Sequence, residues 1–373
     1  MFTIMYPERI IFGRGSLNRL PEQASRFGRK ILLVTGRKAM RKAGVLDKTM
    51  QQLSSSGLNT VLFDDVEHDP SLQTVNRGIE KARKEKVSMV ISVGGGSAID
   101  AGKAIACLAP KEGNVEEYHE GKEIKEPGLP FIAVPTTAGT GAEITNNAVL
   151  TNTTKKIKKS IRSPHMIAKV ALIDPELTIF CPPSLTAHAG MDALTQAIES
   201  FITKNPNPVS DTLALRAIEI LFFNLPLAVK NGQDIEVREK VALGSLLSAM
   251  AFSNSGLGAV HGLAHPLGAH YDIPHGLACA VLLPWVMELN LEVRKEKIEK
   301  IAEKIKVKNA KNVPQAIREL LDKVGIPPTL KEWKIKEKDI PTLIQESRES
   351  GSMKKNPRYL TDEELQQILK KLI

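Results

Sequence analysis

The first half of the chain alternates short apolar runs with amphipathic segments. Five apolar, β-rich runs occupy residues 31–35, 60–63, 87–93, 131–134 and 170–173. Between them, segments such as residues 72–84 and 98–109 carry apolar residues at helical spacing. This alternation of buried strands and helices predicts a parallel sheet with helices on both faces.

The pattern changes after residue 175. The Pro182-Pro183 pair interrupts the chain, and longer segments beyond it (213–223, 237–252 and 298–305) follow the 3.6-residue period of helices. No run beyond about residue 180 has the length and composition of a strand. The sequence therefore predicts an α/β domain over residues 1–180 and an all-α domain over residues 181–373.

Composition limits the classes of protein that this chain can form. Of its 373 residues, 42% are hydrophobic and 25% are charged, which is ordinary usage for a globular protein with a large core. The formal net charge of +9 would suit nucleic acid or a membrane surface. However, only 4% of residues are aromatic, and the lysine-rich segment 295–311 has the pattern of a solvated amphipathic helix. We therefore expect no nucleic acid and no membrane as partners.

The cysteine content and the N-terminal residues indicate a reducing, cytoplasmic compartment. Cys107, Cys181 and Cys279 lie far apart, and no pair has metal-finger spacing. The first 15 residues lack the apolar core of a signal peptide, and no stretch approaches 18 uninterrupted apolar residues. We expect a cytoplasmic protein with reduced thiols.

Two glycine-rich loops follow neighbouring apolar runs of the first half. The first contains Gly95, Gly96, Ser97 and Asp100, and it precedes a helical pattern. Glycines allow close approach of a ligand, and a helix N-terminus attracts a diphosphate. The alternative is a tight strand-to-helix turn with Ser97 as the helix cap. The second loop, residues 135–143, carries small hydroxyl residues and glycines, and together the loops predict a ligand site at the carboxyl ends of the strands.

The helical half contains carboxylate and imidazole groups at spacings that suit a metal. Asp192 and Gln196 are one helical turn apart. His261, His265, His270 and His275 follow within 15 residues, and His261 and His265 also share a helical face. Gly268 and Pro274 are predicted to interrupt the helix before His275. Two imidazoles and one carboxylate would form a divalent metal site, whereas a single histidine here could equally be structural.

These segments resemble one enzyme family over about residues 5–370. The matching motifs are GGGSAIDAGKAIA, PTTAGTGAE, ALIDPELT, GMDALTQAIES, HGLAHPLGAHYDIPHG and NPRYLTDEEL. In order and spacing they resemble the iron-containing (group III) alcohol dehydrogenases, which have the dehydroquinate synthase-like fold. The resemblance implies a Rossmann-like N-terminal domain, a helical C-terminal domain, an active-site cleft between them, and a homodimer or larger homo-oligomer.

The resemblance also assigns the metal ligands. They would be Asp192, Gln196, His261 and His275, where Gln196 stands at a position that is usually histidine in the family. An amide oxygen is a neutral and weaker donor than imidazole. Either the metal, Fe²⁺ or Zn²⁺, is retained with Gln196 as a weak ligand or water anchor, or the site works without metal. We favour retention, because the carboxylate and both outer histidines are present. His265 matches a non-ligand histidine and is the candidate proton relay.

For the nucleotide, the resemblance assigns three groups of residues. The diphosphate region would be Gly95, Gly96, Ser97 and Asp100. Further along, the cofactor would be lined by Thr136, Thr137 and Thr140, with Asn147 and Lys158, and Asp69 would lie near the adenosine. Relatives with an acidic residue at the position of Gly36 hold the ribose 2′-hydroxyl and repel a 2′-phosphate. Gly36 removes that repulsion, and the following Arg37 and Lys38 could pair with the phosphate. We therefore favour NADP(H), with NAD(H) as the alternative cofactor, and an exposed turn is the alternative interpretation of the two cations.

Together these features predict an oxidoreductase that transfers a hydride between NAD(P)(H) and a small alcohol or aldehyde. The substrate oxygen would lie on the divalent metal, which acts as a Lewis acid. A metal-independent reductase on the same fold is the first alternative. A dehydroquinate synthase-like lyase is the second, and it would need a cluster of Lys and Arg that the segments 192–199 and 261–275 do not contain.

Overall fold

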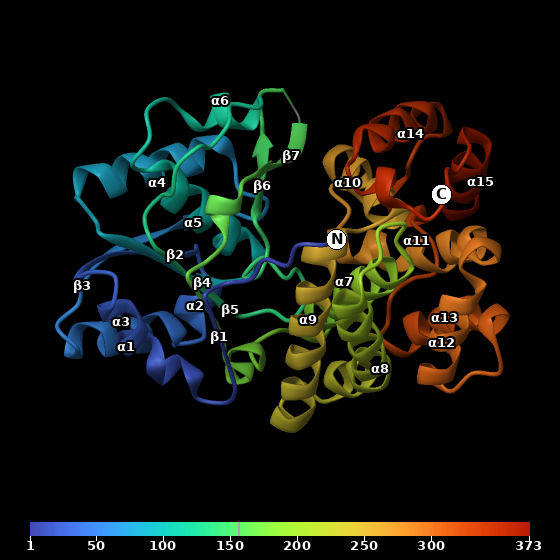
Figure 1. The fold of residues 1–373 in the computed structure, drawn as a ribbon, viewed down its shortest axis with the longest axis horizontal. Coiled ribbons are helices and arrows are strands. Elements are labelled where there is room, and N and C mark those ends of the chain that lie inside the picture. Colours follow the sequence, from blue (N-terminus) through green and yellow to red (C-terminus); the bar gives the residue numbers. More distant parts are fainter. Residues whose placement is uncertain (156) are drawn as a thin grey trace. The chain divides into compact units, whose positions relative to one another are not determined.

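The computed structural model describes every residue of the chain except residue 156 (Figure 1). The chain separates into two compact units. The α/β unit contains Met5–Thr137 and Gly141–Phe180, and the helical unit contains Met1–Ile4, Ala138–Thr140 and Cys181–Ile373. Each unit is described by itself below.

A six-stranded sheet forms the centre of the α/β unit, with strand order β1-β8-β5-β4-β2-β3. All neighbouring strands in it pair in parallel. The strands are β1 (Arg9–Phe12), β2 (Lys30–Gly36), β3 (Asn59–Val66), β4 (Met89–Gly94), β5 (Phe131–Pro135) and β8 (Val170–Ile173). The parallel sheet predicted from the apolar runs is therefore confirmed, and only β1 among these strands was not anticipated.

Helices cover both faces of this sheet, because alternate residues of each strand point to opposite sides. On one face, Ile31 and Leu33 of β2 join the core under α1 (Leu20–Ser25), α2 (Ala39–Lys42) and α3 (Val45–Ser55). On the other face, Leu32 and Val34 join the core under α4 (Leu72–Lys84), α5 (Gly96–Leu108) and α6 (Val115–His119). Figure 1 shows the sheet between its two helical layers, with α4, α5 and α6 on one side and α1 and α3 on the other.

A separate antiparallel hairpin was missed by the sequence pattern. It consists of β6 (Asn147–Asn152) and β7 (Ile157–Arg162). In β6 buried and half-buried residues alternate, whereas β7 is mostly exposed and rich in lysine. Neither strand is a continuous apolar run, so the criterion that found the central strands does not find these two.

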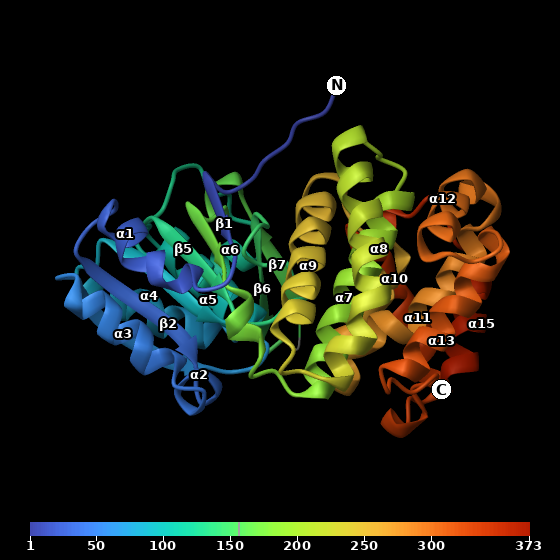
Figure 2. The same cartoon turned by 90° about the horizontal axis from the view of Figure 1, so that it is seen from below.

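The helical unit contains no strand among its described residues, as the sequence predicted. Its helices are α7 (Pro183–Ile202), α8 (Pro208–Lys230), α9 (Ile235–Ser255), α10 (Ala259–Tyr271), α11 (His275–Asn290), α12 (Lys295–Ile305), α13 (Val313–Lys323), α14 (Ile340–Glu349) and α15 (Asp362–Leu372). Its short 3₁₀ turns lie at Glu292–Arg294, Ala310–Asn312, Lys331–Trp333, Glu337–Asp339 and Met353–Lys355, and those of the α/β unit at Ser16–Arg19, Pro164–Met166 and Pro175–Thr178. The long helices α7, α8 and α9 pack along one another (Figure 2).

The helix α8 is long and apolar enough to span a membrane, judged by length and composition alone. Two bent helix pairs, α9 with α10 and α11 with α12, also pass that test if each pair is counted as one span. In the structure α8 packs on α7, α9 and α12. The expectation that the protein acts without a membrane stays a prediction.

The break between α10 and α11 differs from the sequence prediction. Gly268 does not interrupt α10, which continues to Tyr271. Asp272 ends the helix with a left-handed φ of 53° and its N–H bonded to the Gly268 carbonyl. One glycine costs a helix only about 1 kcal/mol relative to alanine, which packing of the neighbouring turns offsets. Pro274 then precedes the first residue of α11, His275, as predicted.

Candidate functional site

The first glycine loop joins β4 to the N-terminus of α5. A Cβ on Gly94 would lie 2.7 Å from the Ala98 Cβ, so this tight turn requires a glycine. Gly95 is the N-cap of α5 and makes no side-chain cap bond. The alternative in which Ser97 caps the helix is therefore wrong. The first N–H groups of a helix have no partner within the helix, and the dipole favours an anion there, so this loop suits a diphosphate.

Asp69 and Lys158 lie beside this loop. The Asp69 N–H donates to Ser97 Oγ at 3.3 Å, and Lys158 Nζ pairs with Asp69 Oδ2 at 2.7 Å. Asp69 has a left-handed φ of 54°, which fixes its orientation in the turn before α4. The structure thus brings together three predicted nucleotide contacts that are far apart in sequence.

The second loop lies next to the first, at the carboxyl ends of β4 and β5. The Thr136 N–H donates to the Gly94 carbonyl at 3.0 Å. A Cβ on Gly95 would lie 3.5 Å from Thr137 Cγ2, so the two loops are in van der Waals range. Thr140 is exposed and belongs to the helical unit. The loops therefore form one edge of the sheet, which is where open α/β sheets bind ligands.

Asp100 and Asn147 take part in a buried network under the loops. Asp100 Oδ2 accepts from the Val149 N–H at 3.1 Å. Lys103 Nζ donates at 2.6–2.9 Å to three main-chain carbonyls, those of Ala142, Thr145 and Asn147. Burial raises the pKa of Asp100 to about 6 and that of Glu143 to about 7, and it lowers the pKa of Lys103 to about 8. These groups hold the second loop against α5, and direct contact of Asp100 with a cofactor stays a prediction.

The end of β2 carries charged side chains that already have partners. Arg37 Nε donates to Asp65 Oδ1 at 3.0 Å, and Arg37 Nη2 lies 3.8 Å from a Glu67 oxygen. Gly36 ends the strand in an ordinary backbone conformation, with space for a Cβ at 3.6 Å from the nearest atom. Lys38 is exposed. Arg37 would have to exchange these carboxylates for a ligand phosphate.

In the helical unit, donor atoms from three helices converge. His261 Nε2 of α10 lies 3.2 Å from Asp192 Oδ1 of α7, and His275 Nε2 of α11 lies 3.9 Å from the same oxygen. The ligand atoms of Asp192, His261, His275 and Cys279 all lie within 4.8 Å of one another. Asp192 and His261 are 3% and 2% exposed, so water competes little with a bound ion.

Gln196 lies on the same face of α7 as Asp192, one turn later. Its Oε1 is buried and has no hydrogen-bond partner among the described residues. A buried acceptor left in this way costs about 1–3 kcal/mol. A divalent cation beside Asp192 would supply the missing partner, so the residues fit a metal at this position.

Glu199, one further turn along α7, holds His261 from behind. Its carboxylate accepts from His261 Nδ1 at 2.7 Å and from the N–H groups of Gly258 and Val260 at 2.9 and 2.7 Å. A Cβ on Gly258 would lie 2.7 Å from Glu199 Oε1, so glycine permits this approach. Burial would lower the pKa of His261, but Cys279, Asp192 and Glu199 outweigh burial and raise it well above 6.5. Such carboxylate–histidine pairs orient imidazole ligands and increase their basicity.

The other two histidines of the motif have different environments. The His265 ring stacks on His275, with centroids 5.4 Å apart and planes at 16°. The structure thus brings His265 to the donor cluster. His270 is exposed, and its Nε2 lies 2.9 Å from the Glu346 carboxylate of α14. This contact joins α10 to α14 and is structural.

Three functional candidates were not identified from the sequence. Glu199 follows Asp192 by seven residues and Cys279 follows His275 by four, so each shares a helical face with a predicted ligand. This spacing was the available signal. Lys103 stands three residues after Asp100, but nothing in a lone lysine pattern indicates complete burial.

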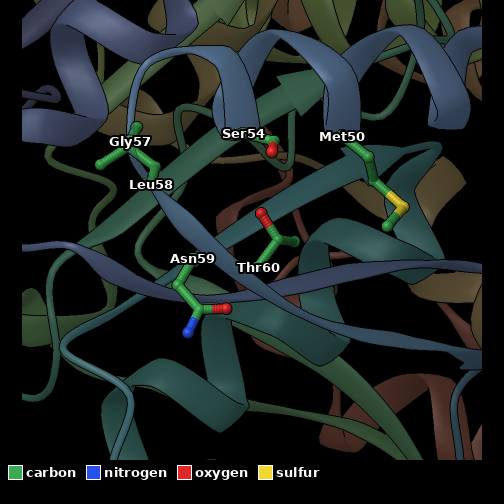
Figure 3. Close-up of a pocket in the computed structure, with 6 residues that line it drawn as sticks. All are labelled: Met50, Ser54, Gly57, Leu58, Asn59 and Thr60. Carbon is green, nitrogen blue, oxygen red and sulfur yellow. The ribbon is translucent and has the colours of Figure 1, made fainter.

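A pocket of about 400 Å³ lies elsewhere in the α/β unit (Figure 3). Met50, Ser54, Gly57, Leu58, Asn59 and Thr60 line it. Asn59 is the first residue of β3, so the pocket is at the edge of the sheet opposite the glycine loops. The six lining residues carry no charged or metal-binding donor set, and we assign no chemistry to it.

Comparison with known proteins agrees with both halves of this description. Residues 7–175 match the family "Iron-containing alcohol dehydrogenase", and residues 186–373 match "Fe-containing alcohol dehydrogenase family, C-terminal". A 1,3-propanediol dehydrogenase from Citrobacter freundii is 39% identical over 380 residues, covering 99% of this chain and 98% of that protein.

Solved structures agree as well. The crystal structure of a 1,3-propanediol oxidoreductase superposes with a TM-score of 0.96 at 39% identity, covering 100% of both chains. A sulfoacetaldehyde reductase from Bifidobacterium kashiwanohense, solved in complex with NAD⁺, superposes with a TM-score of 0.93 at 32% identity, covering 100% of this chain and 98% of that one. With both family regions matched and the full length covered, the chain belongs to the iron-containing alcohol dehydrogenases, a family of oxidoreductases.

Proposed function

We propose that this oxidoreductase transfers a hydride reversibly between a nicotinamide nucleotide and a small alcohol or aldehyde. Residues 1–180 would bind the nucleotide, and residues 181–373 would hold a divalent metal at Asp192, Gln196, His261 and His275. The convergence of Asp192, His261 and His275 beside the unpartnered Gln196 oxygen is the observation that carries this proposal. The relatives named as a propanediol dehydrogenase and a sulfoacetaldehyde reductase support substrates of this size.

The metal, when bound, would act as a Lewis acid toward the substrate oxygen. Asp192 contributes the negative charge that attracts the cation into a buried site. Glu199 holds the Nδ1 proton of His261, so that a bound cation would displace the second proton from Nε2 and meet its lone pair. The partial burial of His275, whose side chain is 32% exposed, leaves one side of the cluster open to a substrate.

His265 is the proposed proton carrier. Its ring is half-buried and stacks on His275 without joining the convergent donor group. An imidazole nitrogen in this position can accept the proton of a substrate hydroxyl and return it in the opposite direction, since imidazole titrates near neutral pH. The stacking on His275 limits the rotation of the ring and keeps it near the reacting oxygen.

The nucleotide would bind along the two glycine loops. The N-terminus of α5 would receive the diphosphate through the N–H groups near Gly95, Gly96 and Ser97. Thr136, Thr137 and Thr140, with Asn147, would follow the cofactor toward the nicotinamide. The Lys158–Asp69 pair adjoins Ser97 and would therefore lie beside the diphosphate, with Asp69 on its adenosine side.

For the cofactor we propose NADP(H) in preference to NAD(H). Gly36 offers no carboxylate to repel a 2′-phosphate, and Lys38 is an exposed cation two residues later. Arg37 is engaged by Asp65 and Glu67, so its contribution would require that these contacts rearrange. The preference therefore rests on the missing acidic side chain at Gly36 more than on a preformed phosphate site.

The test combines metal analysis with activity. Protein purified without added metal is assayed for bound iron and zinc, and for NADPH- and NADH-dependent aldehyde reduction before and after chelation. The proposal expects about one equivalent of metal, and activity that is lost on chelation and returns with metal. Asp192→Ala should lose metal and activity together. Chelator-resistant reduction by metal-free protein would favour a metal-independent reductase and refute the metal assignment.

A further inference from the structure

Cys279 lies within the cluster of donor atoms, although no family motif assigns it a role. It stands one turn after His275 on α11, and it is fully buried. Its Sγ lies 3.6 Å from His275 Nε2. The same sulfur lies within 4.8 Å of the ligand atoms of Asp192 and His261. The site therefore presents a sulfur donor in addition to the oxygens and nitrogens.

The distances among these donors match those around one tetrahedral metal ion. With zinc bond lengths of about 2.0 Å to nitrogen or oxygen and 2.3 Å to sulfur, donors in a tetrahedron lie about 3.3 Å apart, or about 3.6 Å for a nitrogen–sulfur pair. The observed separations are 3.2 Å for His261–Asp192, 3.9 Å for His275–Asp192 and 3.6 Å for Cys279–His275. Small side-chain adjustments would suffice to close all four donors on one ion.

We infer that the Cys279 thiolate is a ligand of the metal and supplies the fourth strong donor that Gln196 does not. This inference rests on the proposed function, since it concerns the same metal. On binding, the Cys279 sulfur–hydrogen bond breaks, the proton passes to solvent, and the sulfur electron pair is donated to the cation. Gln196 Oε1 then serves as a water anchor beside the ion, and the substrate oxygen would add to the ion as a fifth donor.

A thiolate changes both the charge and the selectivity of the site. Asp192 alone leaves a divalent ion with a net charge of +1, whereas Asp192 and Cys279 together neutralise it. A donor set of soft thiolate and imidazole favours zinc over iron more strongly than carboxylate and imidazole alone do. The site is thus a zinc site in a family named for iron.

The chain supplies a matched control for this assignment. Cys107 is buried like Cys279, but it lies on α5 in the α/β unit, and no donor cluster that includes it was found among the described residues. Replacing either cysteine by serine exchanges one buried thiol for a hydroxyl, so the two substitutions are chemically equivalent. Only Cys279→Ser should alter metal binding.

The experiment uses the full chain reconstituted with Co²⁺ after chelation, followed by its absorption spectrum. We expect a sulfur-to-cobalt charge-transfer band in the near ultraviolet for the wild type and for Cys107→Ser. In Cys279→Ser and Cys279→Ala this band should vanish while the visible d–d bands of bound cobalt persist. Zinc affinity should fall by about 100-fold or more, since loss of an outer-shell partner alone costs 10–100-fold. Circular dichroism of each variant verifies that it is folded.

The outcomes separate this inference from the proposed function. If the wild-type protein binds cobalt with d–d bands but without the charge-transfer band, Cys279 is not a ligand, and the proposed metal enzyme still stands. A band that survives in folded Cys279→Ser overturns it as well. Folded protein that binds no cobalt refutes the metal assignment itself, together with this inference. Zinc X-ray absorption with one sulfur at about 2.3 Å provides the second, variant-free support.

Discussion

Glu199 Oε2 lies 2.7 Å from His261 Nδ1, deep in the helical unit. The same carboxylate accepts two main-chain N–H groups at the start of α10, so its position is determined by three contacts. Because Nδ1 is occupied by this contact, Nε2 is the nitrogen that faces Asp192 at 3.2 Å. One buried glutamate on α7 therefore sets the orientation of a ligand on α10.

Removal of this support should weaken metal binding without removing a ligand. We expect Glu199→Gln to lower metal affinity by about 10–100-fold, because the amide is a weaker acceptor for the imidazole N–H and leaves its ligand nitrogen less basic. Competitive chelator titration measures the affinity. Glu219→Gln on the surface of α8 is the control and should bind metal like the wild type. An unchanged affinity in Glu199→Gln would show that Glu199 serves only the fold.

His265→Ala tests the proton carrier. General acid–base groups contribute about 10²–10⁴-fold to rate, so kcat should fall by a factor in this range while metal content is unchanged. His270→Ala is the matched control, because His270 belongs to the same helix but is exposed and paired with Glu346. The kcat–pH profile of the wild type should contain a pKa that His265→Ala loses. If kcat and this profile are the same in both proteins, another group moves the proton.

Gln196→His tests the departure from the family pattern. Imidazole is a stronger donor for first-row transition metals than a neutral amide oxygen, and position 196 shares the helical face of Asp192. We expect the variant to bind iron at least about tenfold more tightly than the wild type, with the fold unchanged. Isothermal titration with Fe²⁺ under anaerobic conditions measures this. Gln196→Ala should instead bind metal more weakly than the wild type, and equal affinities in all three proteins would exclude position 196 from the site.

Gly36→Asp tests the cofactor preference. A carboxylate at the end of β2 would repel a 2′-phosphate and accept from a ribose hydroxyl. The ratio of kcat/KM for NADPH to that for NADH should fall by about tenfold or more, equivalent to about 1.4 kcal/mol. The backbone at Gly36 accepts a side chain, with a Cβ at an ordinary 3.6 Å from the nearest atom. Gly36→Ala adds that Cβ without charge and should leave the ratio near its wild-type value.

The central architecture of the protein was readable in the sequence because its strands are buried on both faces. The run 170–173 coincides with β8 (Val170–Ile173), and the pattern over 72–84 coincides with α4 (Leu72–Lys84). The hairpin β6–β7 was not readable, since buried residues only alternate with half-buried ones in β6, and β7 is mostly exposed and rich in lysine. Burial on one face only, combined with charge, removes the apolar signal on which strand prediction depends.

Sequence motifs and the histidine cluster predicted the candidate metal ligands, but not the residues that contact them. Asp192, His261 and His275 converge although 83 residues separate the first from the last, and sequence order alone does not reveal this. Glu199 and Cys279 were not identified as site residues, because a glutamate or cysteine on a helix is more often unrelated to metal binding. Their roles become visible only when three helices bring them to the same imidazoles.

The buried charges under the glycine loops predict a pH dependence of stability. Burial raises the pKa of Glu143 from 4.5 to about 7, so in the folded protein this carboxyl stays protonated up to that pH. In the unfolded chain it ionises above 4.5. Its contribution to stability is therefore complete below pH 4.5 and is lost as the pH rises to about 7. Asp100 acts in the same direction, with its pKa raised to about 6.

Glu143→Gln removes this dependence while it keeps the shape of the side chain. Between pH 5 and 7, we expect the stability of the variant relative to the wild type to rise by up to about 3 kcal/mol, at 1.36 kcal/mol for each unit of pKa shift. Urea unfolding followed by circular dichroism at pH 5, 6, 7 and 8 measures the difference. Lys103, whose pKa is lowered to about 8 by burial, loses its proton only at the alkaline end of this range. The exposed Glu126→Gln should parallel the wild type at every pH, and a constant offset in Glu143→Gln would mean that Glu143 is ionised in the folded protein.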